Sequence, residues 1–274
     1  MSQYAFYLSK KTHNKSIKVI FSPCSKNEHN GSELDKIFGI KYDNSILARL
    51  LGLLYKQYNS IPKIRRYLHH LGIRVIREPQ NYDYCEKYLK HSFSGLCFYV
   101  GGWHSEKYFV HLRTEILNTF KFNIQNEDTK FKLIYQSIEK DERSVSLHIR
   151  RGDYINHPEF GEIASIDYYN KAILYIKNKI PDANFYCFSN DIEWCRQQLP
   201  KNICYVDINQ NEKSWRDLCL MSICHHHIIA NSTFSWWGAW LSEYTDSINI
   251  CPDQFIKHYI TKDVYPEKWI KIKS

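Results

Sequence analysis

The second half of the chain alternates short apolar runs with amphipathic segments, and this alternation constrains the fold most strongly. The apolar runs have strand length and lie at residues 145–149, 185–188, 203–206, 227–230 and 248–250. Helices are predicted between them at residues 167–180, with Asp167 as N-cap, 191–199, 214–223 and 234–243. Strands that alternate with helices form a parallel sheet with right-handed crossovers. We therefore expect a Rossmann-like α/β domain whose strand-end loops gather at one edge of the sheet.

The first half of the chain is less regular. Helices are predicted at residues 2–10, 33–40, 45–58 and 61–71, and strands at 17–21, 73–76 and 96–100. A largely polar helical segment then leads into the charged run at residues 139–143. We place a domain boundary near residue 141, which divides the chain into residues 1–140 and 141–274.

Composition limits the kind of partner that the chain can have. Lys and Arg total 37 against 29 Asp and Glu, a formal net charge of +8. This balance suits an anionic ligand, a phosphorylated substrate or an acidic membrane face, whereas the scatter of the basic residues disfavours a dedicated nucleic-acid face. The nine cysteines are odd in number and occupy interior positions such as Cys187, which indicates reduced, buried thiols. With no long apolar run in the sequence, we expect a cytoplasmic protein with room for peripheral contact at the inner membrane face.

Two adjacent arginines follow the first predicted strand, in the stretch SLHIRRGDY at residues 146–154. Arg150 and Arg151 would stand at the carboxyl end of that strand, and Gly152 can adopt the positive φ of a tight turn. Their like charges need a compensating anion, and the guanidinium fork fits phosphate oxygens bidentately. Asp153 supplies one negative charge, and a diphosphate could supply the rest. An alternative remains open, in which one arginine pairs with Asp153 and the other points into water.

Two further polar loops are expected at the same edge of the sheet. Ser189, Asn190 and Asp191 follow the second predicted strand, where they would cap the next helix or contact the base or ribose of a nucleotide. The loop after the fourth strand carries an amide and hydroxyls at a helix start, which favour an anion. Its residues are Asn231, Ser232, Thr233 and Ser235.

A cluster of cysteine and histidine raises the question of a metal. Cys219, Cys224 and the run His225–His227 invite a zinc interpretation. Consecutive histidines that enter a strand point to alternate faces, so we favour buried or edge histidines. No acidic pair suited to a divalent cation stands in a plausible loop. We therefore expect a site that needs neither metal nor cofactor, in which arginine neutralises a nucleotide diphosphate.

Several stretches together closely resemble the bacterial α-1,2-fucosyltransferases of glycosyltransferase family eleven. These are SLHIRRGDY (146–154), FSNDIEWCR (188–196) and HHIIANSTFSWWGAWL (226–241). The family's amino-terminal landmarks are resembled by SQYAFYLS near the start, FGIKY (38–42) and GGWHSEKYF (101–109). The arginine motif alone is shared with other fucosyltransferases, whereas the NSTFSWWGAWL stretch is far more specific. The resemblance spans almost the whole chain.

This resemblance implies a GT-B-type enzyme of two Rossmann-like domains, with residues 1–140 on the acceptor side and residues 141–274 binding the donor. The implied reaction is that of a hexosyltransferase, a galactoside 2-α-L-fucosyltransferase. It moves L-fucose from GDP-β-L-fucose to the 2-hydroxyl of a galactoside, with inversion and without a metal. The implied setting is the synthesis of surface glycan, lipopolysaccharide or capsule. Expected partners are GDP-fucose and an oligosaccharide or lipid-linked glycan acceptor, with no nucleic acid.

Roles for individual residues follow from the same resemblance. It assigns Arg150 to the β-phosphate of the donor, in a pocket shaped by His148 and Arg151. Asp153 is expected to orient the arginines, with which it forms the catalytic group. Contacts to the nucleoside are expected from Asn190 and Asp191, and contacts to the diphosphate from Asn231, Ser232, Thr233 and Ser235. His104, Glu106 and Glu28 are candidates for the general base by residue type, with capping and surface roles as alternatives.

The start of the chain departs from the family pattern. Family members normally begin with a strand and a glycine-rich GGLGNQ loop, directly before the segment that here reads MSQYAF at residues 1–6. The first domain is therefore expected to lack that strand and loop, through a misplaced start codon or a truncation. Such a loop would face the donor, so an alternative is a non-catalytic nucleotide-sugar binding protein or a truncated, inactive fucosyltransferase.

Overall fold

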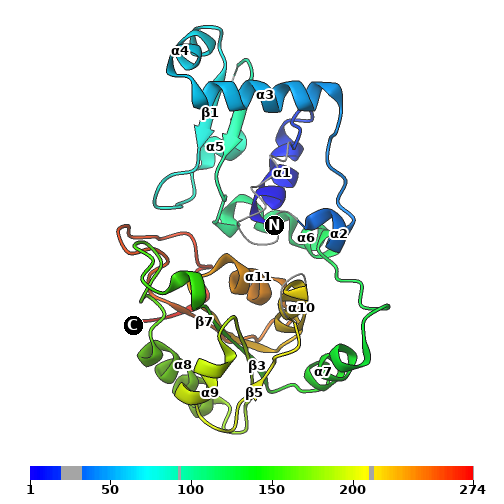
Figure 1. Ribbon diagram of the computed structural model, residues 1–274, viewed down its shortest axis with the longest axis vertical. Helices are drawn as coiled ribbons and strands as arrows, with labels where there is room; N and C mark the ends of the chain where they lie inside the picture. The colour runs from blue at the N-terminus through cyan, green and yellow to red at the C-terminus, as the bar shows by residue number, and fades with distance from the viewer. Residues whose placement is uncertain (20–32, 92–93, 210–212, 274) are drawn as a thin grey trace. The chain divides into compact units, whose positions relative to one another are not determined.

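The computed structural model describes residues 1–19, 33–91, 94–209 and 213–273, and the chain forms two compact units (Figure 1). The first unit is Met1–Lys121 and the second is Phe122–Ser274. This division precedes the predicted one at residues 140–141, because α7 (Thr129–Glu139) packs against α10 (Trp215–Ser222) within the second unit. Asp128, which caps α7, accepts a hydrogen bond from the Arg216 guanidinium at 2.7 Å.

A six-stranded parallel sheet organises the second unit. Its strands are β3 (Ser144–Ile149), β4 (Asn184–Ser189), β5 (Cys204–Tyr205), β6 (His226–Ile228), β7 (Asn249–Pro252) and β8 (Ile270–Ile272). They are ordered β5-β4-β3-β6-β7-β8, and every neighbouring pair is parallel. The five predicted strands are all present. The alternation does not predict β8, because the connection from β7 to β8 contains turns and bends but no helix.

Helices cover both faces of this sheet, and in Figure 1 α8 and α9 lie on one side and α10 and α11 on the other. The bounds not yet given are α8 (Ile166–Lys179), α9 (Ile192–Gln198) and α11 (Thr233–Leu241). All six residues of β3 are buried, as expected of a central strand covered on both faces. Val145, Leu147 and Ile149 join the core beneath α8 and α9, while the His148 ring lies 5.6 Å from Phe234 of α11.

The prediction of Asp167 as the N-cap of α8 is wrong. The cap is Ser165, whose Oγ accepts a hydrogen bond from the backbone N of Tyr168 at 3.2 Å. Asp167 lies inside the first turn and pairs with Lys171, one turn further along. Serine and aspartate both favour the N-cap position, so residue type alone does not determine which of the two caps the helix.

The strand order determines where a ligand can bind in the second unit. The chain builds outward from β3 through β4 to β5, then returns to the other side of β3 to place β6, β7 and β8. The direction of strand addition therefore switches between β3 and β6. In open α/β sheets, ligands bind outside the carboxyl ends of the strands at such a switch point. The loops that follow β3 and β6 are thus the expected walls of a site.

The first unit combines helices with a two-stranded parallel sheet. Its elements are α1 (Ser2–His13), α2 (Leu34–Phe38), α3 (Ile46–Ser60), α4 (Pro62–His70), β1 (Arg74–Arg77), α5 (Glu86–Lys90), β2 (Cys97–Val100), the 3-10 helices η1 (Glu106–Tyr108) and η2 (Val110–Leu112), and α6 (Arg113–Thr119). The four predicted helices and the strands predicted at 73–76 and 96–100 are confirmed. The strand predicted at 17–21 is wrong for residues 17–19, which form no strand, and residues 20–21 lie outside the described residues. Phe6 of α1 stacks on Trp103 at 4.0 Å in the core of this unit.

In the described part of the chain, no helix has both the length and the apolar character needed to cross a membrane.

The side chains of β3 that face α8 provide a test of this core. Replacing the fully buried Leu147 with alanine leaves a cavity beneath α8, and we expect the free energy of unfolding to fall by about 2–5 kcal/mol. The control Leu174→Ala removes a side chain of α8 that is 60% exposed, and its effect should stay within about 0.5 kcal/mol. Urea unfolding followed by tryptophan fluorescence measures both. Equal losses in the two variants would contradict this placement of the core.

Candidate functional site

The loop after β3 holds Arg150 against Asp153. Arg150 Nη2 donates to Asp153 Oδ2 at 2.9 Å, and Nε lies 2.8 Å from Oδ1. The guanidinium carbon also lies 5.5 Å from the centre of the Tyr154 ring. Gly152 begins a short 3-10 helix (η3, Gly152–Tyr154) with a φ of 41°, which confirms the tight turn. A Cβ at Gly152 would lie 2.4 Å from Nδ2 of Asn190, so the loop needs glycine for space as well as for backbone conformation.

Arg151 is held by the loop that follows β4. Its Nε donates to Asp191 Oδ2 at 3.1 Å, and its backbone N donates to Asn190 Oδ1 at 2.9 Å. The guanidinium carbon lies 4.0 Å from the Trp194 ring centre, a cation–π distance. Asp191 also caps α9, since its Oδ1 accepts from the backbone N of Trp194 at 3.2 Å. The alternative with one arginine in water is therefore half correct: Arg150 pairs with Asp153, but Arg151 pairs with Asp191.

His148 lies behind the arginines on β3 and is 4% exposed. Burial, and then the positive charge of Arg150, lower the pKa of His148 to about 3, so the imidazole is neutral near pH 7. Within the described residues, its Nδ1 has no hydrogen-bond partner. A buried polar atom in that state can gain a hydrogen bond from a bound ligand without losing an existing one.

The loop after β6 is largely structural. Asn231 is 1% exposed, and its Nδ2 donates to the carbonyls of Phe160 at 3.0 Å and Phe255 at 3.2 Å. Ser232 caps α11, and its own carbonyl accepts from the buried Ser235 hydroxyl at 3.4 Å. Of the four residues predicted here as diphosphate contacts, only Thr233 has an exposed side chain. An anion at this loop would therefore meet the Thr233 hydroxyl and the backbone N–H groups that begin α11.

The three predicted loops meet at one edge of the second unit. The loops after β3 and β4 are joined through Arg151 and its two partners, Asn190 and Asp191. The Tyr154 hydroxyl donates to the Asn231 carbonyl at 3.3 Å, which joins the loops after β3 and β6. Two guanidiniums, a neutral histidine and a helix start thus surround the switch point between β3 and β6. This arrangement can bind a dianion such as a diphosphate.

The histidine run is buried or at the sheet edge, as predicted. His225 Nε2 pairs with Asp246 Oδ1 at 2.8 Å, His226 Nδ1 accepts from the Ile248 backbone N at 3.1 Å, and His227 Nδ1 lies 2.8 Å from Ser146 Oγ. Burial lowers the pKa of His226 to about 4 and that of His227 to about 3. Each ring is directed to a different partner, so the three do not converge on one point.

The first unit contains a buried carboxylate–histidine pair, the Glu78–His104 dyad. Glu78 directly follows β1, and His104 follows β2, so both stand at carboxyl ends of parallel strands. His104 Nδ1 lies 3.1 Å and 3.2 Å from the two Glu78 oxygens, which also accept from the backbone N of His104 at 2.6 Å and of Gly102 at 2.8 Å. Burial by itself raises the pKa of Glu78, but these hydrogen bonds and the His104 charge outweigh it and leave the pKa below its usual value.

The backbone between β2 and His104 is shaped around this dyad. A Cβ at Gly102 would lie 2.1 Å from the His104 ring, and one at Gly101 would lie 2.4 Å from the Glu78 Cβ. Trp103 has a φ of 54°, a conformation rare for such a residue, and its packing on Phe6 holds it there. Sequence reasoning named His104 by residue type but missed Glu78. The double glycine after one strand and an acidic residue directly after its neighbour are the signal that could have found it.

Of the other two residues considered as a general base, one lies among the described residues and one does not. Glu106 begins η1 and is half-buried, next to Ser105, whose hydroxyl accepts from the Lys107 backbone N at 3.3 Å. Glu28 lies outside the described residues. The dyad is therefore the better-defined base candidate in the first unit.

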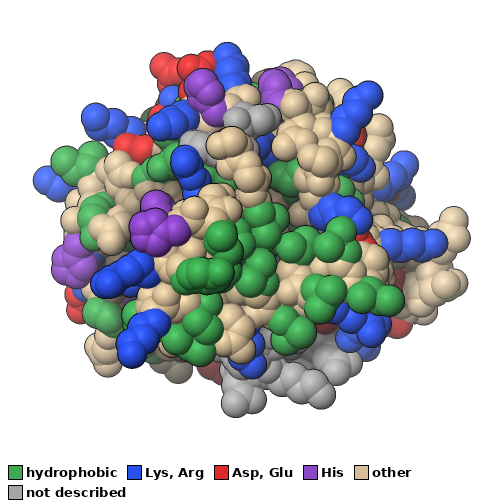
Figure 2. Space-filling view, turned by 90° about the horizontal axis from the view of Figure 1, so that it is seen from above, with side chains coloured by type: hydrophobic (Ala, Val, Ile, Leu, Met, Phe, Trp, Pro, Cys, Tyr) green, Lys and Arg blue, Asp and Glu red, His purple; other side chains and the backbone are tan. Residues whose placement is uncertain are grey.

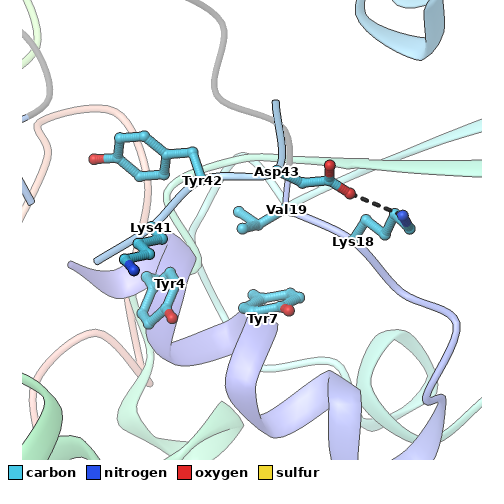
Figure 3. A pocket seen from close by; sticks show the side chains of 7 residues that line it. All are labelled: Tyr4, Tyr7, Lys18, Val19, Lys41, Tyr42 and Asp43. Carbon is cyan, nitrogen blue, oxygen red and sulfur yellow. Dashed lines mark hydrogen bonds and ion pairs between the residues drawn. The ribbon is translucent and has the colours of Figure 1, made fainter. Parts of the chain in front are cut away.

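A hollow of about 220 Å³ opens elsewhere in the first unit (Figure 3). It is lined by the side chains of Tyr4, Tyr7, Lys18, Val19, Lys41, Tyr42 and Asp43. Lys18 Nζ pairs with Asp43 Oδ2 at 2.8 Å in its wall. Phenol rings beside cations suit a small polar ligand, and the volume is below that of most ligand pockets.

The family model for glycosyltransferase family 11 matches residues 38–273, a range that includes both the dyad and the arginine loop. An α-1,2-colitosyltransferase of Escherichia coli is 30% identical over 263 residues, which cover 90% of this chain and 84% of the relative. The O-antigen biosynthesis glycosyltransferase WbnK of Escherichia coli is 34% identical over 167 residues, 58% of this chain and 55% of the relative. A galactoside α-(1,2)-fucosyltransferase 1 of Leontocebus fuscicollis is 26% identical over 182 residues, 61% of this chain and 50% of the relative. The matched region thus spans about half the length of the last two.

The depressed pKa of Glu78 predicts a pH-dependent contribution to stability. A carboxylate whose pKa is lower in the folded chain stabilises the fold above its unfolded pKa, here about 4.5, and this contribution is lost as pH falls through the folded value. Glu78→Gln should therefore lower the free energy of unfolding at pH 7, and its difference from the unmodified chain should shrink as the pH drops below about 4.5. Chemical unfolding at a series of pH values measures this, with the exposed Glu243→Gln as control. A difference that stays constant from pH 7 to pH 3 would contradict the ionised dyad.

Proposed function

Because the chain belongs to glycosyltransferase family 11, we propose that it transfers L-fucose from GDP-β-L-fucose to the 2-hydroxyl of a galactoside acceptor, with inversion at the anomeric carbon. The observation that carries this proposal is the pair Arg150 and Arg151 at the switch point of a parallel sheet. The relatives support the linkage, since an α-1,2 bond is named for the colitosyltransferase and for the fucosyltransferase. The name of WbnK supports a role in bacterial surface glycan synthesis.

The second unit would hold the donor. Asp153 is 44% exposed on its side chain and Arg150 is 21% exposed, so the pair is accessible to an incoming diphosphate. A phosphate can take the place of Asp153 in front of the Arg150 fork with the same bidentate geometry. Asp191 and Trp194 keep Arg151 in position while its charge adds to the field at the site. Asn190 and Thr233 would complete the polar rim toward the nucleoside and the diphosphate.

Catalysis on the donor side would be electrostatic. As the bond between the fucosyl carbon and the phosphate oxygen breaks, negative charge grows on GDP, and fixed cations stabilise that charge more in the transition state than in the ground state. A hydrogen bond to a charged group contributes roughly 1.5–3 kcal/mol. The neutral His148 adds a ring nitrogen without adding a like charge beside Arg150.

The first unit would supply the acceptor side of a GT-B-type enzyme, with His104 as general base. Inversion needs a group that takes the proton of the acceptor hydroxyl while its oxygen bonds to the fucosyl carbon and GDP leaves. Glu78 holds Nδ1 of His104, which makes Nε2 the basic nitrogen, as in other carboxylate–histidine pairs. His104 would be the catalytic residue and Glu78 a positioning residue.

A colitosyl donor is a second candidate. The colitosyltransferase is the relative of which this chain covers the greater part, 84%, whereas it covers half of the fucosyltransferase. Parallel assays with GDP-linked fucose, colitose and mannose distinguish the donors. The preferred donor is the one with the highest kcat/KM, since that ratio measures discrimination.

We expect Arg150→Ala to reduce turnover by at least about 10²-fold, because it removes the cation that faces the departing diphosphate. The measurement is GDP release from GDP-fucose with lactose and other galactosides as acceptors, in the presence of EDTA. Arg196→Ala is the matched control, since Arg196 is 44% exposed and pairs only loosely, at 3.5 Å, with Glu193. Unchanged turnover in Arg150→Ala would refute the assignment. GDP binding without turnover by the unmodified chain would instead indicate a non-catalytic nucleotide-sugar binding protein.

For the dyad, His104→Ala should lower kcat by about 10²–10⁴-fold and leave GDP binding unchanged. Glu78→Gln should lower kcat less and shift the pH profile, because it changes the group that holds the imidazole. Calorimetric titration with GDP separates the two units' roles, and His69→Ala, an exposed histidine of α4, serves as control. A His104→Ala enzyme with full kcat would exclude this base.

A further inference from the structure

An exposed apolar stripe runs along α3. It consists of Ile46, Leu47, Leu50 and Leu53, which are 78%, 53%, 57% and 60% exposed. Ile46, Leu50 and Leu53 are spaced by four and three residues, so they share one face of the helix. The opposite side of α3 is anchored in the unit through Ala48 and Tyr58, which are buried. Four large apolar side chains in water on one helix are more than scattered surface hydrophobics.

The segment that carries this stripe contains basic residues but no acidic ones. No Asp or Glu occurs between Asp43 and Glu78. The same stretch contains seven Lys and Arg residues, all of them exposed: Arg49, Lys56, Lys63, Arg65, Arg66, Arg74 and Arg77. All of the charged Lys, Arg, Asp and Glu residues between Asp43 and Glu78 are therefore cations.

The stripe and the cations lie beside each other. Helices α3 and α4 pack together, and α4 carries Lys63, Arg65 and Arg66 next to the exposed Tyr67. Figure 2, which looks onto the molecule from the α3 and α4 side of Figure 1, shows hydrophobic side chains gathered at the centre of this face, with Lys and Arg around them. The apolar stripe and the cations of residues 49–77 thus belong to neighbouring elements of the first unit.

We propose that this face docks on a bilayer that contains anionic lipid, with the apolar stripe inserted among the headgroups and the cations on their phosphates. A helix with leucines on one side and Lys and Arg beside them binds in the membrane interface. A leaflet of anionic lipid attracts each nearby cation. This surface goes beyond the proposed transfer reaction and does not depend on it.

Other binding partners for this face would match either the apolar stripe or the cations, but not both. A second copy of the chain would place seven cations against seven cations, which repel each other. An acidic protein or a nucleic acid would account for the charges but would leave four large apolar side chains without a role. A bilayer with anionic headgroups satisfies both at once.

The first test is flotation of the full chain with vesicles of phosphatidylcholine containing 30 mol% phosphatidylglycerol, against vesicles of phosphatidylcholine alone. We expect binding to the first and little to the second, and a steep loss of binding between 0.05 and 0.5 M salt, as screening shortens the reach of the cations. Leu50→Ser with Leu53→Ser should reduce the partition coefficient by about tenfold or more. The matched control is Leu133→Ser with Leu174→Ser, which removes leucines that are 62% and 60% exposed in the second unit.

Charge reversal provides the second test. Lys63→Glu with Arg66→Glu should weaken binding by more than about fivefold per residue, the factor expected for one cation at an anionic surface. Lys201→Glu with Lys268→Glu, also exposed, lowers the net charge equally and should bind nearly as the unmodified chain does. Circular dichroism and thermal unfolding verify that the four variants fold.

A measurement on the unmodified chain tests the proposal without depending on the folding of any variant. Hydrogen exchange with and without the anionic vesicles should show added protection in residues 46–60. Protection elsewhere but not there would overturn the proposal, as would equal binding to both vesicle types or equal loss in the control variants. Binding to polyglutamate or RNA that depends on Lys63 and Arg66, without binding to vesicles, would assign the face to a macromolecule instead. Because no readout uses turnover, a failed transfer assay leaves these outcomes distinct.

Discussion

The pairing of β3 between β4 and β6 is the constraint on which the second unit depends. Ser146 is in register with Tyr186 on one side and with His227 on the other, and its hydroxyl bonds to the His227 ring inside the sheet. This position makes β3 the strand at which the topology reverses. It delivers His148, Arg150 and Arg151 to the switch point of the sheet, where ligands bind in open α/β sheets. A shift of register by one residue would exchange Leu147 and His148 between the faces of the sheet.

The two units use the same physical device with different chemistry. In each, polar groups stand at the carboxyl ends of parallel strands, and a glycine leaves space for a polar side chain: Gly152 for Asn190 and Gly102 for His104. The second unit gathers cations there and the first a carboxylate–imidazole pair, which suit a leaving anion and a departing proton respectively. The range matched by the family model contains both groups of residues.

Much of the second unit could be predicted because its elements are local patterns. Apolar runs and helix periodicity predicted five strands and four helices, and the polar residues that follow three of those strands predicted the loops of the site. The features that the sequence did not predict correctly depend on contacts between residues distant in sequence. Arg151 finds Asp191, forty positions away, only when β3 and β4 pair. The division between the units follows from α7 packing on α10, and β8 follows from a connection without helical pattern.

The α/β class, the arginine loop and the family could be predicted before the structure, because residue types and their spacing within short stretches set them. The folded chain shows which carboxylate each arginine meets, that Asn231 and Ser235 bond to backbone carbonyls, and that Glu78 pairs with His104. It also shows that α3 leaves its leucines in water beside a face of cations. Burial and partner choice arise from the packing of segments far apart along the chain, and no local pattern encodes that packing.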